Sequence, residues 1–267
     1  MSVRVGIVQI ASGENKEENL EKAKRMVLQA ADNDSKLVML PEMFNYLPEV
    51  PNAEKYRRNA ESLNGPTINS MIEIAFERNI TIISGSIAEN CQGRIYNTSC
   101  LIRPSRKVFT YRKVHLFKFG NINETAIFEN GAEPLVTIGE GLKIGLTTCF
   151  DLRFPELYRT EALMGAQVIT NVAAFLESTG RAHWMVLLRA RAIENQVFIL
   201  AANQAKSARR GATYYGNSAV IDPWGKILAR AHQKEELLIT DICPAKVDEV
   251  RNKMPAICAR RPSVYKL

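Results

Sequence analysis

Apolar and polar residues follow two different periods along the chain, and the two periods predict strands and helices in turn. Alternation over residues 3–10 predicts a first strand. Asn15, with Glu18 three residues later, has the spacing of a capping box and opens a predicted helix. One face of that helix is apolar, at Leu20, Ala23, Val27 and Ala30. The chain therefore begins with a strand followed by an amphipathic helix.

The same alternation of elements continues to the end of the chain. Further strands are predicted at 37–40, 80–87, 95–102, 108–113, 142–148, 167–172, 197–202, 218–221, 226–230 and 237–242. A second helix follows Gly65-Pro66, with an apolar face at Ile68, Met71, Ile72, Ala75 and Phe76. Other helices are predicted at 155–164, at 183–194 and near Val247, and 116–134 is a long loop with short helical turns. Buried strands alternating with helices, together with a hairpin around Pro104-Ser105, indicate an α/β protein with mixed sheets. Because no linker or repeat interrupts the pattern, we expect one domain over residues 1–267.

Composition narrows the class of protein. The 267 residues are 46% hydrophobic and 24% charged, which excludes disordered and fibrous proteins. The longest apolar run, 197–202, is far shorter than the ~18 residues of a membrane-spanning helix. The first ten residues alternate and do not form the apolar block of a signal peptide, so we expect a cytoplasmic protein that does not bind membranes.

Charge and metal-binding residue types exclude two further classes. The formal net charge is +7, but the basic residues occur at most in pairs, without the stripe or module typical of nucleic-acid binding. The five cysteines include no CxxC pair, and the three histidines have no HxxH or HxxxH spacing. The sequence therefore predicts no nucleic-acid partner, no disulfide framework and no metal site. The positive surplus still favours small anionic substrates.

Cys149 is the cysteine with the most informative surroundings. It follows the predicted strand LKIGLTT and precedes FDLRFPELYR, in which Pro155 is suited to begin a helix. Open α/β sheets place reactive groups at such strand ends. A helix dipole and nearby cations would lower the pKa of this thiol. By position alone, a reactive thiol and a small buried apolar residue remain equally open.

Two other predicted strand ends carry the groups that a nucleophile needs. Glu42 follows LVML-Pro41, and Lys113 ends VFTYRK. A carboxylate at a crevice can take a proton from a thiol, and a lysine can hold the negative charge that develops on an oxyanion. Each residue taken alone has the more ordinary interpretation of a solvated strand end.

The three residues together resemble the nitrilase superfamily of carbon–nitrogen hydrolases, over nearly the whole chain. The matching segments are LPEMF around Glu42, YRKVHLF around Lys113 and TTCFDLRFPEL around Cys149, supported by STGRAHW, RARAIENQVFILAANQ and YYGNSAVIDPWGKIL. The resemblance implies an αββα sandwich and a Glu–Lys–Cys triad that hydrolyses amides or nitriles through a thioester. It also implies a second glutamate in the loop after the lysine, at Glu124, and an oxyanion site shared by Lys113 and the backbone amide of Phe150.

Within the superfamily, CFDLRFPEL and STGRAHW are most similar to the branch of ω-amidase and deaminated-glutathione amidase. That similarity implies that Arg153 and Thr179 contact the carboxylate end of the substrate, for which the planar fork of an arginine is suited. An ion pair that holds the helix beginning at Pro155 is the alternative for Arg153. We expect Tyr46 to take the place of the substrate-binding tyrosine usual in this branch, at a different offset, and Arg181 replaces the usual proline. Both differences lie where substrates are recognised, so they leave the substrate open and the chemistry unchanged.

These implications combine into one expected function. It is a thiol amidohydrolase without a cofactor, which cleaves the terminal amide of a small carboxylate-bearing amide and releases ammonia from a homodimer or larger homo-oligomer. Alternatives are another branch of the superfamily, such as a carbamoyl-amine hydrolase, and a non-catalytic member that binds a metabolite. Of the histidines, we interpret His183 as structural or as supporting the site, His115 as a packing residue, and His232 as exposed.

Overall fold

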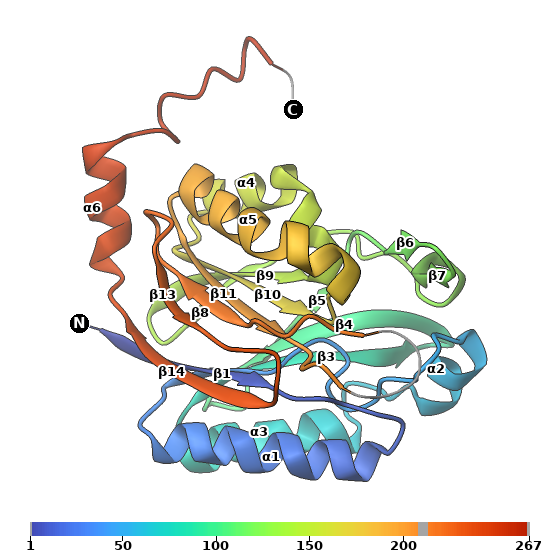
Figure 1. Ribbon diagram of the computed structural model, residues 1–267. Coiled ribbons are helices and arrows are strands. Elements are labelled where there is room, and N and C mark those ends of the chain that lie inside the picture. Colours follow the sequence, from blue (N-terminus) through green and yellow to red (C-terminus); the bar gives the residue numbers. More distant parts are fainter. Residues whose placement is uncertain (1, 208–212, 266–267) are drawn as a thin grey trace.

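Two six-stranded mixed sheets stack face to face in the computed structural model, which describes residues 2–207 and 213–265 (Figure 1). The first sheet has the order β14 (Glu236–Ile242), β1 (Val3–Gln9), β2 (Leu37–Met39), β3 (Thr81–Cys91), β4 (Arg94–Ile102) and β5 (Val108–Arg112). The second has the order β13 (Ile227–Arg230), β12 (Ala219–Ile221), β11 (Phe198–Asn203), β10 (Val168–Ala173), β9 (Leu142–Thr148) and β8 (Val136–Gly139). In each sheet three neighbouring strands are parallel, β1–β2–β3 and β9–β10–β11, and the outer strands are antiparallel.

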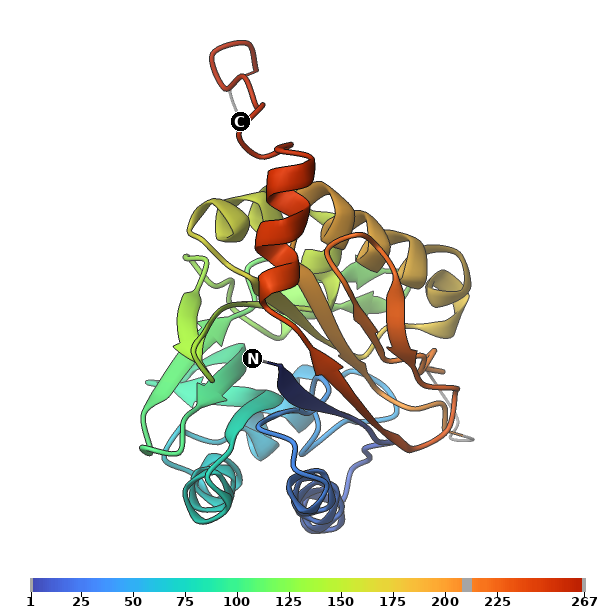
Figure 2. The ribbon, with the colours of Figure 1, turned by 90° about the vertical axis from the view of Figure 1, so that its left-hand side faces the viewer.

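Helices cover the outer face of each sheet. Helices α1 (Lys16–Asp32) and α3 (Pro66–Arg78) lie against the first sheet, and α4 (Pro155–Leu163) and α5 (Glu177–Asn195) against the second (Figures 1 and 2). The remaining helices are α2 (Ala53–Asn59) and α6 (Ala245–Lys253). The predicted α/β fold, an αββα sandwich of two mixed sheets, is confirmed. Among the described residues, no helix has the length and apolar character needed to cross a membrane.

Three apolar layers hold the sandwich together. The central layer lies between the two sheets and includes Ile7, Met39, Leu146 and Phe198, which are at most 2% exposed. The second layer packs the first sheet against α1 and α3, and the third packs the second sheet against α4 and α5. Strands buried on both faces explain why several of them read as continuous apolar runs in the sequence.

Helix α1 begins as predicted, because the side chain of Asn15 accepts a hydrogen bond from the backbone N–H of Glu18. On α3 the prediction for Phe76 was wrong, since its side chain is 53% exposed and Ile74 is buried instead. The guanidinium of Arg106 lies 4.2 Å from the centre of the Phe76 ring. That stacking shields an aromatic face that the apolar period assigned to the core.

The predicted start of α5 was also wrong, since the helix begins at Glu177, six residues before His183. The first two turns contain Gly180 and lack the apolar period that marks a helix. Gly180 is required there by packing, because a Cβ on it would lie 2.6 Å from the Tyr215 side chain. A tertiary contact thus accounts for a residue that weakens the helical pattern.

Helix α2 and strand β8 had no prediction. The predicted loop 116–134 contains one short hairpin, β6 (Lys118–Phe119) and β7 (Ile122–Asn123), and one 3₁₀ turn, η1 (Glu124–Ala126). The hairpin around Pro104-Ser105 is confirmed as β4 and β5.

Candidate active site

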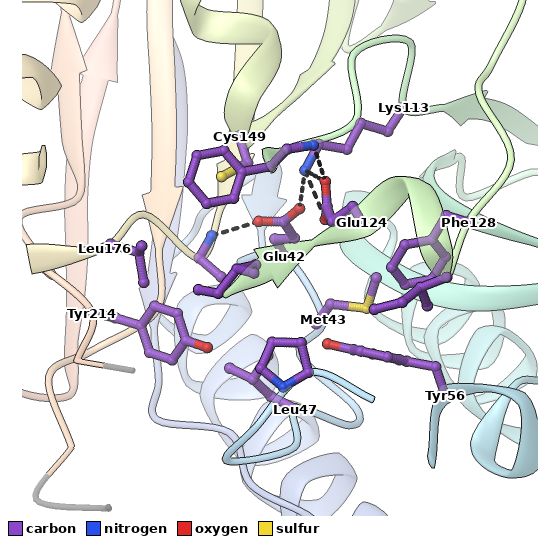
Figure 3. A pocket seen from close by; sticks show the side chains of 15 residues that line it. Glu42, Met43, Leu47, Tyr56, Lys113, Glu124, Phe128, Cys149, Leu176 and Tyr214 are labelled. Atoms are coloured by element: carbon purple, nitrogen blue, oxygen red, sulfur yellow. Dashed lines mark hydrogen bonds and ion pairs between the residues drawn. The ribbon is translucent and has the colours of Figure 1, made fainter. Parts of the chain in front are cut away.

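The ends of three strands bring the predicted triad residues into one pocket. Lys113 directly follows β5, Cys149 directly follows β9, and Glu42 lies three residues beyond β2. The sheets place these strand ends on the same side of the sandwich, and all three side chains line a pocket that Glu124 also lines (Figure 3). Residues separated by more than a hundred positions therefore share one cavity.

Lys113 lies between the two carboxylates. Its Nζ is 2.9 Å from Oε1 of Glu42 and 2.7 Å from Oε2 of Glu124, and its side chain is 1% exposed (Figure 3). Burial opposes the lysine charge, but the charges of Glu124 and Glu42 outweigh it and raise the pKa of Lys113 well above its ordinary value. The ammonium has three N–H groups, and it contacts Oε1 of Glu42 and both carboxylate oxygens of Glu124.

Glu42 is held by a lysine, an amide side chain and the backbone. In addition to Lys113, Oε1 accepts a hydrogen bond of 2.8 Å from Nδ2 of Asn97, which lies on β4. Oε2 accepts one of 2.7 Å from the backbone N–H of Ala174, directly after β10. The carboxylate is thus fixed between the two sheets, beside Cys149.

Glu124 begins the turn η1, whose N-cap residue Asn123 accepts a hydrogen bond from the backbone N–H of Thr125. Its Oε2 accepts a hydrogen bond of 2.7 Å from the backbone N–H of Phe117. Burial raises the pKa of Glu124, Lys113 opposes this, and the charge of Glu42 adds to it. The structure thus places Glu124, the glutamate that the resemblance implies in the loop after the lysine, in contact with Lys113.

Cys149 occupies a strained turn at the end of β9. Its φ is +47°, in the left-handed region that non-glycine residues adopt rarely, and it opens the 3₁₀ helix η2 (Cys149–Arg153). Asp151 supports the turn, because its Oδ2 accepts a hydrogen bond of 2.9 Å from the backbone N–H of Thr148. This geometry directs the thiol out of the strand toward Glu42 and Lys113 (Figure 3).

Asp151 also connects the cysteine turn to the lysine segment. It is fully buried and accepts hydrogen bonds from Tyr111 Oη at 2.6 Å and from the backbone N–H of His115 at 2.9 Å. The His115 imidazole lies 2.7 Å from the same carboxylate and stacks on Phe154, with ring centres 3.6 Å apart. Tyr111 and His115, two positions before and two positions after Lys113, thus both bind the carboxylate of Asp151. Sequence reasoning missed Asp151, although an acidic residue inside an otherwise apolar segment was a usable signal.

The pKa of the Cys149 thiol shifts in the direction opposite to the one expected from the sequence. Burial raises it well above its ordinary value, the charge of Glu42 adds to this, and Lys113 opposes it only in part. The expected lowering by a helix dipole and cations is therefore wrong for this site. A thiol in this setting holds its proton until a neighbouring base removes it.

A second pocket lies on the other side of Cys149. Phe150, Arg153 and Thr179 line it, and Glu42, Lys113 and Glu124 do not. The Arg153 guanidinium lies 5.1 Å from the centre of the Phe175 ring, and its Nη1 is 3.2 Å from Nδ1 of His183. Among residues 2–207 and 213–265, no carboxylate pairs with Arg153, so the alternative of a helix-bracing ion pair finds no partner. Burial without a counter-charge lowers the pKa of this guanidinium.

Tyrosines other than the predicted one line the first pocket. Tyr46 packs edge-to-face against Tyr56, with ring centres 6.1 Å apart, and lines neither pocket. Tyr56 and Tyr214 do line the first pocket (Figure 3). Sequence reasoning missed both, because Tyr56 belongs to the unpredicted helix α2 and Tyr214 lies outside the strands.

In the part of the chain that the structure describes, no group of three or more histidine, cysteine or acidic side chains is arranged to hold a metal ion. The site is built from one thiol, one ammonium and two carboxylates.

Comparison with known proteins agrees with this architecture. The pattern of the family described as carbon-nitrogen hydrolase matches residues 4–252, and the chain belongs to that family. It is 35% identical to a Dictyostelium discoideum protein named deaminated glutathione amidase, over 99% of this chain and 96% of the relative. It is 33% identical to the human protein named omega-amidase NIT2, over 99% of this chain and 97% of the relative. Among solved structures, Saccharomyces cerevisiae Nit3, a member of branch 10 of the nitrilase superfamily, is similar with a TM-score of 0.87 and 31% identity, over 95% of this chain and 94% of that one.

Proposed function

We propose that this protein is a thiol amidohydrolase that cleaves the terminal amide of a small carboxylate-bearing amide through a thioester on Cys149. The observation that carries the proposal is the contact of Lys113 with both Glu42 and Glu124, in a pocket that also contains the Cys149 thiol. The relatives named omega-amidase and deaminated glutathione amidase support amide chemistry.

The acylation step follows from the high pKa of the thiol. As the Cys149 sulfur attacks the amide carbon, Glu42 takes the thiol proton and the carbonyl electron pair moves to oxygen. The ammonium of Lys113 and the backbone N–H of Phe150 hold the oxyanion. When the C–N bond breaks, the leaving nitrogen takes the proton from Glu42 and departs as ammonia.

Deacylation uses the same groups in reverse. Glu42 takes a proton from water as the water oxygen attacks the thioester carbon. The C–S bond then breaks, and the thiolate takes the proton back from Glu42. Glu124 keeps Lys113 in place during both steps, because both of its carboxylate oxygens contact the ammonium.

The carboxylate of the substrate binds in the second pocket. Arg153 is half-buried there without an acidic partner among the described residues, and Thr179 lies on the same wall. An unpaired guanidinium beside the nucleophile is stabilised by an anionic ligand. This contact favours amides of dicarboxylates or α-keto acids.

The proposal extends to the state of the protein in the cell. The chain acts as a single catalytic domain over residues 1–267, in a homodimer or larger homo-oligomer, in the cytoplasm, and without a cofactor. The five cysteines, all within the described residues, are unpaired, which fits a reducing compartment. Sedimentation at several concentrations measures the assembly.

Trapping of the acyl-enzyme tests the mechanism. With succinamate or glutaramate as substrate, hydroxylamine should compete with water and yield a hydroxamate, and Cys149→Ala should abolish both hydroxamate and acid. Cys243→Ala is the matched control, because Cys243 is exposed. Hydrolysis without hydroxamate, or full activity in Cys149→Ala, would contradict the proposal.

A further inference from the structure

Two tyrosine hydroxyls face each other across the first pocket. Tyr56 comes from α2 and Tyr214 from the segment before β12, and Figure 3 shows both hydroxyls directed into the space beneath Glu42. Leu47 lies beside them, and we call this part of the pocket, lined by Leu47, Tyr56 and Tyr214, the tyrosine end. Tyr56 is only 4% exposed.

The two hydroxyls lack partners within the described chain. Elsewhere in the chain, the hydroxyl of Tyr111 donates a hydrogen bond to Asp151, and that of Tyr158 shares one with Thr147. For Tyr56 and Tyr214, no hydrogen bond of the hydroxyl is found among residues 2–207 and 213–265. A tyrosine hydroxyl that lines a pocket without a protein partner can hydrogen-bond a polar group of a ligand in that pocket.

The surrounding charges restrict what that group is. Burial raises the pKa of both tyrosines, and the charges of Glu42 and Glu124 raise it further, so the hydroxyls remain neutral in a negative potential. Among the described residues that line this pocket, the positively charged one is Lys113, and it is already bound to both carboxylates. A carboxylate is therefore disfavoured at the tyrosine end, and an uncharged hydrogen-bonding group is accepted.

The position of the tyrosine end relative to the scissile bond rests on the proposed function. Glu42 lines the first pocket and is absent from the second, whereas Arg153 lines only the second. The acyl chain that ends at Arg153 extends away from Glu42. The leaving nitrogen must lie next to Glu42 to take its proton, so a substituent on that nitrogen extends into the first pocket.

We propose that the tyrosine end is a binding site for the leaving amine, so that the enzyme cleaves N-substituted amides whose amine part carries an uncharged hydrogen-bonding group beyond a short apolar linker. Met43, Ile127 and Phe128 line the same pocket and supply the apolar surface for the linker. The substrate then has a negative acyl end at Arg153 and an uncharged amine end at Tyr56 and Tyr214.

The test compares four amides of glutarate: glutaramate itself and its N-propyl, N-hydroxypropyl and N-carboxyethyl derivatives. Release of the amine is measured for each. We expect the wild type to cleave the N-hydroxypropyl amide with a kcat/KM about 3- to 10-fold above that of the N-propyl amide, because one hydrogen bond is gained. The N-carboxyethyl amide should be at least about 10-fold poorer than the N-propyl amide, because a carboxylate meets a negative wall.

Variants locate the effect. Tyr56→Phe and Tyr214→Phe should each reduce the preference for N-hydroxypropyl over N-propyl, and the double variant should abolish it. Tyr215→Phe is the matched control, because Tyr215 packs against Gly180 and lines neither pocket, so its preference ratio should equal that of the wild type. Melting temperatures show whether each variant folds.

The outcomes separate this proposal from the proposed function. Cleavage of glutaramate without cleavage of any N-substituted amide would overturn the leaving-amine site and leave the amidase function intact. An unchanged preference in the double variant would also overturn it. Failure to cleave any of the four amides would overturn both.

Discussion

The guanidinium of Arg153 and the imidazole of His183 are in direct contact, with Nη1 and Nδ1 3.2 Å apart. Arginine has only donors, so Nδ1 of His183 must be the acceptor and its proton must lie on Nε2. His183 lies on α5 and Arg153 on η2, so this contact connects the covering helix to the turn that carries Cys149. The relationship supports the interpretation of His183 as a residue that supports the site.

Arg153→Ala should lower kcat/KM for an ω-amide with a free carboxylate by at least about 30-fold, because removing one partner of a desolvated charge pair costs roughly 2–5 kcal/mol. A neutral amide of equal length should lose far less, because it does not use the guanidinium. Steady-state kinetics on the two substrates measure the difference. Equal losses with a lower melting temperature would show that Arg153 only supports the fold.

Replacing His183 should act through Arg153. His183→Leu removes the acceptor and should raise KM for the carboxylate substrate about 3- to 10-fold, the effect of one hydrogen bond, with little change in kcat. His183→Asn places an amide oxygen near the position of Nδ1 and should restore most of the affinity. If Asn and Leu behave alike, the hydrogen bond to Arg153 has no role in binding.

The raised pKa of Cys149 predicts how the thiol reacts with alkylating agents. Because a raised pKa leaves the thiol protonated at neutral pH, its alkylation by iodoacetamide should be slow there and accelerate as the pH rises into the alkaline range. Exposed Cys243 and Cys258 should be labelled first. Peptide mapping at a series of pH values measures each site. Fast labelling of Cys149 below neutral pH would indicate a resting thiolate and contradict the role of Glu42 in acylation.

Glu161, which is fully buried on α4, should make stability depend on pH. Burial raises its pKa well above the ordinary value, and the charge of Asp151 adds to this. Between the pKa of Glu161 in the unfolded chain and its higher pKa in the folded protein, the folded state keeps a proton that the unfolded state has released. The free energy of unfolding therefore falls as the pH rises through this interval. Glu161→Gln should remove this loss and raise Tm at pH 8 by about 2–4 °C, equivalent to ~1 kcal/mol.

The gain from Glu161→Gln should vanish at about pH 3, where both states of the wild type are protonated. Glu156→Gln, at an exposed position on the same helix, is the matched control and should leave the pH dependence of Tm unchanged. A gain in Tm that is equal at both pH values would contradict the assignment to Glu161.

Local patterns in the sequence were enough to determine the class of fold and the family. Periodicity located most strands of both sheets, and a capping residue marked the start of α1 at Asn15. Short motifs around Glu42, Lys113 and Cys149 indicated the reaction class through their resemblance to the nitrilase superfamily. Such features depend on neighbours a few positions away.

The tertiary structure decided what depends on residues distant in the chain. The sign of the pKa shift of Cys149 comes from burial and from Glu42, more than a hundred positions away, and neither is visible in the local segment. Likewise, Tyr56 and Tyr214 line the pocket and Tyr46 does not, since α2 and the segment before β12, which are far apart in the sequence, meet there. Burial and electrostatic potential are properties of the packed chain, so they appear only once the two sheets have come together.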